Sequence, residues 1–369
     1  MINLSRFDHL RSEKMIQFKE EVIGGLDVTI VSYMVASPDL WKQSLAIECR
    51  GITFNTMTGE CICRPFHKFF NIGENEHTLP ENIPWDTLVS LLEKRDGSMI
   101  TPILINETLY WKTKKSFYSD VAVEAASNTN KFIERFSAAI IRRGYTPVFE
   151  YTSPTCEIVI NYGSEPQFVL LAVRDMQTGA YMPYAEMALL AETFNVKCIK
   201  AFPLMTYSEL AEQMKTIEDF EGYVLRFDGY GMTQLNKQKS DWYFRMHRVK
   251  TDLRERDVAD MCIEETLDDV KSVITAAGLS LAPIEEIENR ISLQISDVVV
   301  QVKLLLNAAL KMDNRKDVAL AYKDHPLFGL LMNAYIGKEP DYKKYWVRNF
   351  RDGYNLRTIY SNFKSGPET

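Results

Sequence analysis

Lys94-Arg95-Asp96-Gly97 lies between two β-prone segments, in the run Leu91-Leu92-Glu93-Lys94-Arg95-Asp96-Gly97-Ser98-Met99-Ile100. An apolar pair precedes the lysine, and an acid and a glycine follow it, which places the lysine where a strand meets a turn. A lysine held there can act as a nucleophile. An ordinary Asp-Gly turn would have much the same sequence, because short motifs often match by chance. The role of Lys94 and Gly97 therefore depends on the rest of the chain.

The length and composition predict a soluble protein of more than one domain. The chain has 369 residues, and with roughly 150 residues in a typical domain we expect two or three domains. Hydrophobic residues make up 46% and charged residues 25%, as in globular proteins. No apolar run approaches the roughly 20 residues that cross a bilayer, so we expect no membrane association. Residues 1–8 lack a signal segment, which predicts an intracellular protein.

The cysteines and the net charge argue against some classes of site. The six cysteines include no Cys-x-x-Cys pair, and the five histidines form no ligand-spaced cluster with them, so we expect no structural zinc. A net charge of −7 argues against a protein that coats nucleic acid indiscriminately. Between Gln234 and Arg256, however, seven basic residues outnumber three acids around the aromatic run Trp242 to Phe244. This segment is either a nucleic-acid surface or a solvated helix face with its aromatic residues in the core.

The residue pattern predicts strands in the first two thirds of the chain and helices after it. The expected strands are 28–35, 47–54 and 60–63 as a hairpin, 99–104 and 108–112 as a second hairpin, 147–151, 158–160, 168–173 and 221–227. The expected helices are 120–143, 184–193, 207–216, 251–265, 267–276, 284–311 and 316–336. Because the β signal stops near residue 250, we predict a catalytic domain over 1–250 and an all-helical domain over 251–369, with the boundary in 245–255.

Charged residues near the strand ends favour phosphate chemistry. They form an ordered series: Arg50, Lys68, Lys94, Lys112, Lys114, Glu150, Glu221, Lys237 and Lys239. The chain has no Gly-x-x-x-x-Gly-Lys-Ser/Thr, Gly-x-Ser-x-Gly or His-Glu-x-x-His motif. A lysine attacks a phosphate only as the neutral amine, a form that nearby cations or burial favour. The same cations would neutralise a triphosphate, and the carboxylates could hold a metal ion or a ribose. Each residue alone is more often a surface charge, and the order of the set favours function.

That order carries a resemblance to a known superfamily. Lys94-x-Asp96-Gly97, Phe149-Glu150, Glu221-Gly222-Tyr223-Val224 and Lys237-x-Lys239 resemble the successive motifs of the lysine nucleotidyltransferases, which are ATP-dependent DNA ligases, RNA ligases and mRNA capping enzymes. Longer strings resemble the bacteriophage RNA ligase 1 family over residues 25–250: Glu48-Cys49-Arg50-Gly51, Arg64-Pro65, Lys68-Phe69-Phe70-Asn71 and Lys239-Ser240-Asp241-Trp242-Tyr243. The helical part is similar more weakly, chiefly through His325-Pro326-Leu327-Phe328-Gly329.

The resemblance implies a fold and a reaction. The fold is α+β: a nucleotidyltransferase (ATP-grasp-like ligase) domain of antiparallel sheets with flanking helices, followed by an all-helical domain that helps to select the RNA. The reaction uses ATP with Mg²⁺ or Mn²⁺. Lys94 would take AMP from ATP, the AMP would pass to an RNA 5′-phosphate, and a 3′-hydroxyl would then displace it.

The resemblance also implies roles for individual residues. The adenosine side would be bound by Tyr33, Arg50, Lys68 and Glu150, and the phosphates by Lys112, Lys114, Lys237 and Lys239. Glu221 would bind the metal or the nucleotide, and Gly97 would let the backbone come close to the bound nucleotide. Tyr243 would be essential. Asp268 matches an acid used for magnesium, but Thr266-Leu267-Asp268-Asp269 also fits a helix N-terminus with acids in its first turn. The chain departs from the family pattern at Lys115, Arg226 and Arg245.

The expected partners follow from the same resemblance. The substrate is expected to be RNA with 5′-phosphate and 3′-hydroxyl ends, in particular cleaved tRNA that is being repaired. The protein is expected to be a monomer in the cytoplasm, which is that of an infected bacterium if the gene is from a phage. A DNA ligase or a capping guanylyltransferase is an alternative, and labelling by GTP or sealing only of nicked DNA would favour it. An inactive RNA-binding module is a third, and it would bind RNA in a salt-dependent way without forming an adenylate.

Overall fold

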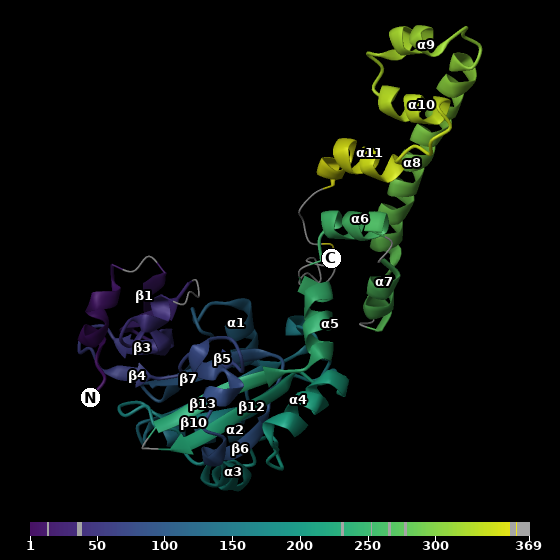
Figure 1. The fold of residues 1–369 in the computed structure, drawn as a ribbon. Helices are drawn as coiled ribbons and strands as arrows, with labels where there is room; N and C mark the ends of the chain where they lie inside the picture. Colours follow the sequence, from purple (N-terminus) through teal and green to yellow (C-terminus); the bar gives the residue numbers. More distant parts are fainter. Residues whose placement is uncertain are drawn as a thin grey trace. The chain divides into compact units, whose positions relative to one another are not determined.

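A computed structural model describes residues 1–12, 15–34, 39–229, 232–251, 253–264, 267–276, 279–354 and 359. The chain divides into two compact units, Met1–Phe244 and Arg245–Thr369. In the described part of the chain, the first unit contains all of the strands and the second contains only helices (Figure 1). The division falls at the start of the segment 245–255, where the sequence predicts the domain boundary.

The N-terminal sheet of the first unit has four antiparallel strands in chain order. They are β1 (Ile16–Ile23), β2 (Leu26–Tyr33), β3 (Arg50–Asn55) and β4 (Cys61–Cys63). The predicted hairpin is present as β3 and β4, in which Phe54 lies opposite Cys61. A short 3₁₀ helix, Leu4–Leu10, buries one face against this sheet and completes its core.

Two further sheets form the rest of the first unit. A four-stranded antiparallel sheet has the order β10 (Gln167–Asp175), β9 (Tyr145–Thr152), β7 (Ser98–Ile105), β8 (Thr108–Lys112). A five-stranded sheet has the order β11 (Ala201–Phe202), β6 (Leu88–Glu93), β12 (Gly222–Gly229), β13 (Met232–Lys239), β5 (Phe70–Asn71). Its β13–β5 pair is parallel and its other pairs are antiparallel.

Helices flank these sheets. They are α1 (Asp120–Ser127), α2 (Lys131–Ile141), α3 (Tyr184–Thr193) and α4 (Tyr207–Thr216). The prediction of one helix over 120–143 is wrong, because the Asn130 side chain accepts hydrogen bonds from two amides and begins α2 as a separate helix. The predicted strand 158–160 is also absent. The amides of Val159 and Ile160 donate to the carboxylate of Asp96 instead of to a neighbouring strand.

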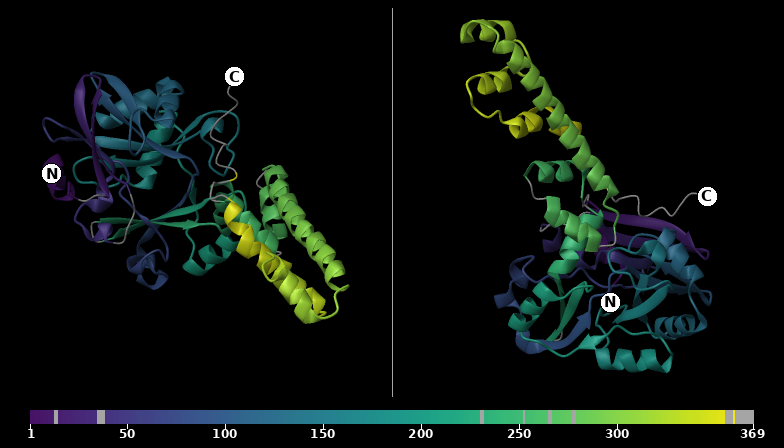
Figure 2. Two further views of the ribbon diagram at one scale, coloured as in Figure 1. Left: turned by 90° about the horizontal axis from the view of Figure 1, so that it is seen from above. Right: turned by 90° about the vertical axis from the view of Figure 1, so that its right-hand side faces the viewer.

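The second unit is helical in its described residues. Its helices are α6 (Glu255–Glu264), α7 (Leu267–Ala276), α8 (Ala282–Ala309), α9 (Arg315–Tyr322), α10 (Phe328–Tyr335) and α11 (Tyr342–Asn349), and α5 (Asp241–Thr251) enters from the first unit. Helices α6, α10 and α11 lie against α8 (Figure 2). The single helix predicted over 316–336 is divided into α9 and α10 by a turn at His325, whose carbonyl accepts from the Phe328 amide.

Helix α8 is long and apolar enough to match a membrane-crossing helix by length and composition alone. That match is weak evidence, since core helices of soluble proteins pass the same test. The side chains of α8 that are buried within the protein are Ile284, Ile287, Ile291, Val298, Val302 and Ala309. They pack in clusters with residues of the neighbouring helices.

The Lys94–Gly97 turn joins the five-stranded sheet to the four-stranded one, since β6 ends at Glu93 and β7 begins at Ser98. A Cβ atom on Gly97 would lie 2.6 Å from the Tyr151 carbonyl oxygen, so only glycine lets the turn approach β9 this closely. The Lys94 amide donates to the Gly222 carbonyl. Gly222 has a φ of +148° that other residues rarely adopt.

Candidate active site

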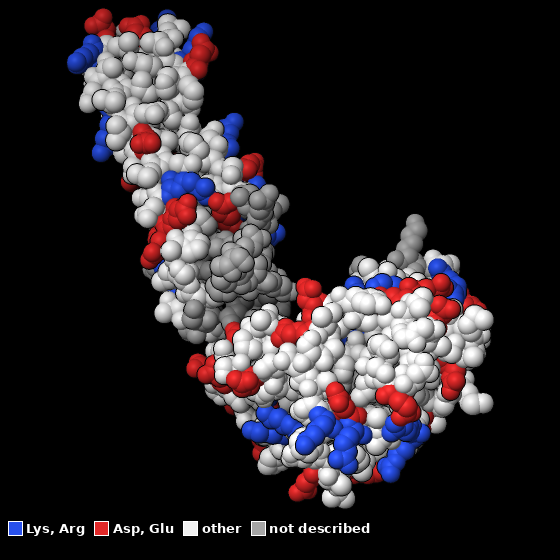
Figure 3. Space-filling view, turned by 180° about the vertical axis from the view of Figure 1, so that it is seen from behind, with Lys and Arg blue, Asp and Glu red and all other residues white. Residues whose placement is uncertain are grey.

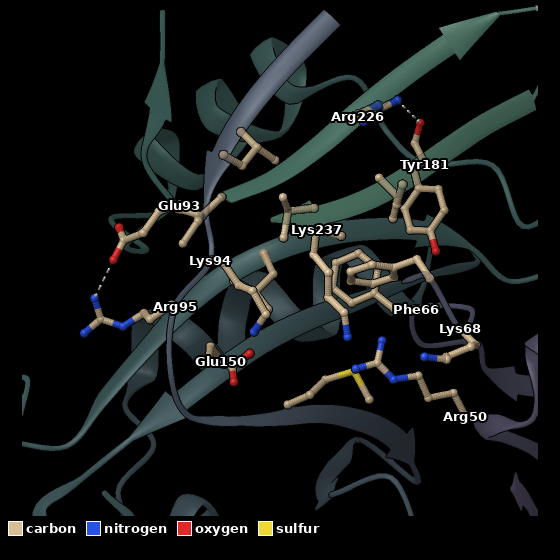
Figure 4. A pocket seen from close by; sticks show the side chains of 18 of the residues that line it. Arg50, Phe66, Lys68, Glu93, Lys94, Arg95, Glu150, Tyr181, Arg226 and Lys237 are labelled. Atoms are coloured by element: carbon tan, nitrogen blue, oxygen red, sulfur yellow. Dashed lines mark hydrogen bonds and ion pairs between the residues drawn. The ribbon is translucent and has the colours of Figure 1, made fainter. Parts of the chain in front are cut away.

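A pocket of about 250 Å³ lies between the four-stranded and five-stranded sheets. Its apolar lining comes from both sheets and the adjoining segments: Leu92, Met99, Leu171, Ala172, Ile199, Val224 and Leu235. The lining also includes Tyr33 and Gly97, which the sequence singled out. Its charged residues that the sequence singled out are Arg50, Lys68, Lys94, Glu150 and Lys237 (Figure 4). An apolar cavity with convergent charged groups is the usual form of a ligand site.

Lys94 is held beside a buried carboxylate. Its Nζ lies 2.6 Å from Oε1 of Glu221, and Nζ of Lys239 lies 3.1 Å from the same oxygen. Glu221 is 2% exposed, and its Oε2 has no hydrogen-bond partner among the described residues. The carboxylate therefore fixes the amine at the pocket wall.

Three cations, Arg50, Lys68 and Lys237, line the part of the pocket away from Lys94. A fourth, Lys114, lies near Arg50 and Lys68. Figure 4 shows Lys237 between Lys94 and the pair Arg50 and Lys68. Burial, together with the charges of Lys68 and Lys94, lowers the pKa of Lys237 to about 8. Burial and the neighbouring cations likewise lower the pKa of Lys114 to about 8, and its Nζ lies 3.4 Å from the centroid of the Tyr33 ring. This crowding of positive charge favours an anionic ligand.

Glu150 is a buried carboxyl group that faces the pocket beside Lys94 (Figure 4). Burial raises the pKa of Glu150 to about 8, the nearby Lys94 opposes the rise, and the charge of Glu221 adds to it. When a carboxyl group has a higher pKa in the folded than in the unfolded protein, the folded protein loses stability as the pH rises from the unfolded-state pKa to the folded-state pKa. The window here runs from about 4.5 to about 8.

Replacing Glu150 by glutamine is therefore expected to stabilise the ligand-free protein at pH 8, by roughly 2–4 kcal/mol. The gain should shrink toward zero at pH 5, because the wild-type carboxyl is then protonated in the folded protein. Thermal melting of both proteins at several pH values measures it. The exposed Glu192→Gln is the matched control and should show no such pH-dependent gain. Equal melting temperatures of wild type and Glu150→Gln at pH 8 would contradict the assignment.

The structure does not bring every predicted residue to the pocket. Lys112 is fully buried, its Nζ donates to the Gly51 carbonyl at 2.8 Å, and burial lowers its pKa. It therefore supports the strand that carries Arg50 and is not among the residues that line the pocket. Lys239 reaches the site only through Glu221. Asp268 lies in α7, and its side chain is outside the described residues.

Tyr243 supports the Lys94–Gly97 turn from behind the pocket. Its hydroxyl donates to Oδ1 of Asp96 at 2.7 Å, while Oδ2 of Asp96 accepts from the amides of Val159 and Ile160. Burial and the carboxylates of Glu221 and Asp96 raise the pKa of Tyr243, which keeps the hydroxyl a donor. Trp242 and Tyr243 are thus core residues and Phe244 is exposed, so the aromatic run of this segment is not a continuous nucleic-acid surface.

Replacing Tyr243 by phenylalanine is expected to lower the free energy of unfolding by about 1–3 kcal/mol, because Oδ1 of the buried Asp96 loses a hydrogen-bond donor. The ring still fills its space, so the protein should fold. Denaturation in urea at neutral pH measures the change. Tyr118→Phe, on a largely exposed tyrosine, is the control and should be nearly neutral. An unfolding midpoint equal to that of the wild type would show that the bond to Asp96 adds nothing.

A buried ionic network supports the pocket wall, and sequence reasoning did not assign it. Glu48 accepts hydrogen bonds from Arg64 at 2.9 Å and from Arg174 at 2.8 Å. Arg174 also donates to the Pro65 carbonyl. Although burial alone would raise it, the two guanidinium groups hold the pKa of Glu48 at about 2. Glu48 and Arg64 stand in the quoted strings, but Arg174 belongs to no recognisable motif.

Arg226, a departure from the family pattern, also braces the pocket. Its guanidinium donates to the carbonyls of Met182 and Tyr181 and pairs with Asp228 at 3.0 Å. The side chain is buried although it lies in the apolar strand β12. The available sequence signal was a pair of opposite charges two residues apart, Arg226 and Asp228, in a largely apolar strand.

A family model described as RNA ligase matches residues 48–253, which carry the pocket. The chain belongs to the RNA ligase family. It is 32% identical over 68% of its length to the "Putative RNA ligase" of Thermovibrio ammonificans, and 27% identical over 65% of its length to "RNA ligase 1" of bacteriophage TS2126. The matches span 66% and 62% of those proteins, which is less than two thirds of either one.

Comparison of structures shows the fold of this RNA ligase family member. A solved structure named "Putative ATP-dependent DNA ligase from Aquifex aeolicus" is similar over 77% of this chain and 75% of its own, with a TM-score of 0.51 and 14% identity. The likeness confirms the predicted nucleotidyltransferase architecture of antiparallel sheets with flanking helices.

Proposed function

We propose that the protein is an ATP-dependent RNA ligase that joins 5′-phosphate and 3′-hydroxyl ends through a lysyl-AMP and an RNA-adenylate. The observation that carries the proposal is the position of the Lys94 amine, 2.6 Å from Glu221 and facing a set of cations across the pocket. Membership of the RNA ligase family supports the choice of reaction.

In the first step, the neutral Lys94 amine attacks the α-phosphorus of ATP. A nitrogen–phosphorus bond forms, the bond to pyrophosphate breaks, and the amine loses a proton. Lys237 is placed to neutralise the charge that develops on the departing phosphates. Arg50 and Lys68, which the resemblance assigns to the adenosine side, lie close enough to Lys237 to share this role. Glu221 orients the amine by its ion pair. The apolar lining of the pocket is suited to an adenine base.

In the second step, a 5′-phosphate oxygen of RNA attacks the same phosphorus and the lysine departs. In the third step, a 3′-hydroxyl attacks the RNA phosphate, AMP departs, and a phosphodiester forms. The cations of the pocket serve each step, because negative charge collects on phosphate oxygens every time.

The residues present fit a divalent metal bound together with the nucleotide. No group of three His, Cys, Asp or Glu side chains gathers in the described part of the chain, so the protein alone offers no full cage. Oε2 of Glu221 has no partner there, and Glu150 is a buried carboxyl nearby. Mg²⁺ commonly takes one or two carboxylates with substrate phosphates. When bound, the ion would offset phosphate charge.

For the biological role, we propose repair of cleaved tRNA by a monomer in a bacterial cytoplasm, with the helical unit contributing to RNA selection. The resemblance to the bacteriophage family supports this role. Acidic and basic side chains are interspersed over the larger unit on the face seen in Figure 3, which fits recognition of particular ends better than indiscriminate coating.

A sealing assay tests the proposed function. The protein is incubated with Mg²⁺, with ATP or GTP, and with nicked tRNA stem-loops, single-stranded RNA or nicked DNA. We expect joining with ATP and RNA only, and faster joining of the nicked stem-loop. Sealing of DNA alone, or nucleotide transfer from GTP, would overturn the proposal in favour of a DNA ligase or a capping enzyme.

A further inference from the structure

Three aromatic side chains adjoin one end of the pocket: Tyr33, Trp41 and Phe70. The ring centroids of Tyr33 and Trp41 are 5.1 Å apart, those of Trp41 and Phe70 are 5.9 Å apart, and both pairs meet edge to face. We call these residues the aromatic edge. All three are only partly buried. Tyr33 and Trp41 pack on the N-terminal core, which holds the rings in place on that side.

Cations accompany the aromatic edge. Nζ of Lys68 lies 4.4 Å from the Phe70 centroid and 5.8 Å from that of Trp41, and Nζ of Lys114 lies over Tyr33. Tyr33 and Lys68 line the pocket, whereas Trp41 does not. The edge therefore begins at the pocket and continues outside it. Lysines alternating with exposed ring surface are the arrangement by which proteins bind single-stranded nucleic acid.

The geometry of the reaction indicates which strand passes here. Lys94 is bonded to the α-phosphorus in the lysyl-AMP, and pyrophosphate has left from the side opposite the lysine. In the second step the lysine is the leaving group, so the attacking 5′-phosphate must approach from that same opposite side, because attacking and leaving groups lie roughly in line. The cations placed to bind pyrophosphate, including Lys68, thus also receive the 5′-phosphate. Figure 4 shows Lys68 and Lys94 on different sides of the pocket.

We propose that the aromatic edge, with Trp41 at its centre, stacks the base of the 5′-terminal nucleotide of the RNA strand that accepts AMP. The inference rests on the proposed function and adds a binding site outside the nucleotide pocket. A 5′-phosphate held by Lys68 places the attached nucleoside next to the rings that adjoin this lysine. Stacking then orients the phosphate for attack without reading the base, since every base offers a flat face.

The alternative is that Trp41 only completes the N-terminal core. The test therefore compares Trp41→Leu, which keeps apolar bulk, with Trp41→Phe, which keeps a ring. Phe132→Leu is the matched control, because Lys131 lies over the Phe132 ring at 5.3 Å on α2, away from the pocket lining. The adenylylated enzyme is freed of ATP and mixed with a short 5′-phosphorylated RNA or with the same RNA lacking its 5′-terminal base.

We expect Trp41→Leu to raise the half-saturating RNA concentration for AMP transfer about tenfold, and more than it slows lysyl-AMP formation. Trp41→Phe should retain most of the affinity, and Phe132→Leu should match the wild type. Removing the terminal base should raise the half-saturating RNA concentration of the wild type by about the same factor. It should raise that of Trp41→Leu little further. If Trp41 has only a structural role, Trp41→Leu will weaken the binding of both RNAs by the same factor, and that result overturns the inference.

Two further outcomes are decisive. If Trp41→Leu raises the half-saturating concentration only of the RNA strand that supplies the 3′-hydroxyl, the assignment of the aromatic edge to the 5′-phosphate strand is overturned. If the wild type forms no lysyl-AMP, the proposed function fails by itself, and the aromatic edge is then judged by fluorescence anisotropy with the same two RNAs. If the wild type and Trp41→Leu bind each RNA with the same affinity, and neither protein distinguishes the two RNAs, the aromatic edge is not a base-stacking site.

Discussion

Replacing Lys94 by arginine is expected to lower the rate of RNA joining by at least about a thousandfold. Arginine keeps the positive charge that pairs with Glu221, but its guanidinium does not lose a proton in proteins and cannot act as the attacking amine. Initial rates of joining of 5′-phosphorylated RNA with ATP measure the loss. Lys215→Arg is the matched control, because Lys215 also pairs with a glutamate, Glu212 at 3.0 Å, on an exposed helix face. It should join RNA at the wild-type rate.

A second substrate separates loss of the nucleophile from loss of the fold. Synthetic RNA that already carries AMP on its 5′-phosphate needs only the third step, which does not involve attack by Lys94. We expect Lys94→Arg to seal this RNA at a readily measured rate. Joining of ordinary 5′-phosphorylated RNA at more than a tenth of the wild-type rate would contradict the assigned role of Lys94.

Replacing Glu48 by glutamine is expected to lower the free energy of unfolding by about 3–5 kcal/mol, because two buried guanidinium groups lose their shared carboxylate. Glutamine keeps the size of the side chain, so the effect reports the charge. Urea denaturation followed by tryptophan fluorescence measures it. Four of the five tryptophans, Trp41, Trp85, Trp111 and Trp242, lie in the first unit and report on its unfolding.

An exposed ion pair provides the control for Glu48. Asp39 pairs with Lys42 at 2.8 Å with both side chains exposed, and Asp39→Asn should leave the unfolding midpoint almost unchanged. The pH dependence gives a second check. Because the pKa of Glu48 is lowered to about 2, its stabilisation is complete above pH 4.5 and is lost as the pH falls toward 2. A loss of stability below about 1 kcal/mol at pH 7 would contradict a structural role for the network.

The fold was predictable where one local pattern decides it. The hairpin of β7 and β8 follows from β-branched runs around Asn106 and Glu107, which adopt positive φ in the structure. Segments decided by distant contacts were not predictable. The run 158–160 has strand composition, yet its amides bind Asp96, about sixty residues earlier in the chain. The break between α1 and α2 is different, because Asn130 caps α2 and asparagine is favoured at helix N-termini over helix interiors; the prediction of one helix missed this local signal.

The pocket residues were predictable as a set, and their individual roles were not. Ordered motifs named Arg50, Lys68, Lys94, Glu150 and Lys237, which all line one cavity. Sequence order alone does not show which face of a strand a residue occupies. It also does not show where a strand ends: Lys112 is the last residue of β8 and is buried, whereas Lys114 follows the strand and is partly exposed. Arg174 was missed because a buried cation is recognisable only from its partner, Glu48, which lies more than a hundred residues away.

The central claim is that Lys94 carries AMP during the reaction. Mass spectrometry of peptides from protein incubated with ATP and Mg²⁺ tests it most directly. The account predicts one adenylate, located on the peptide that contains Lys94, released by pyrophosphate or by 5′-phosphorylated RNA, and absent from Lys94→Ala. An adenylate on another residue, or one that persists in Lys94→Ala, would contradict it, as would the absence of any adduct in the wild type.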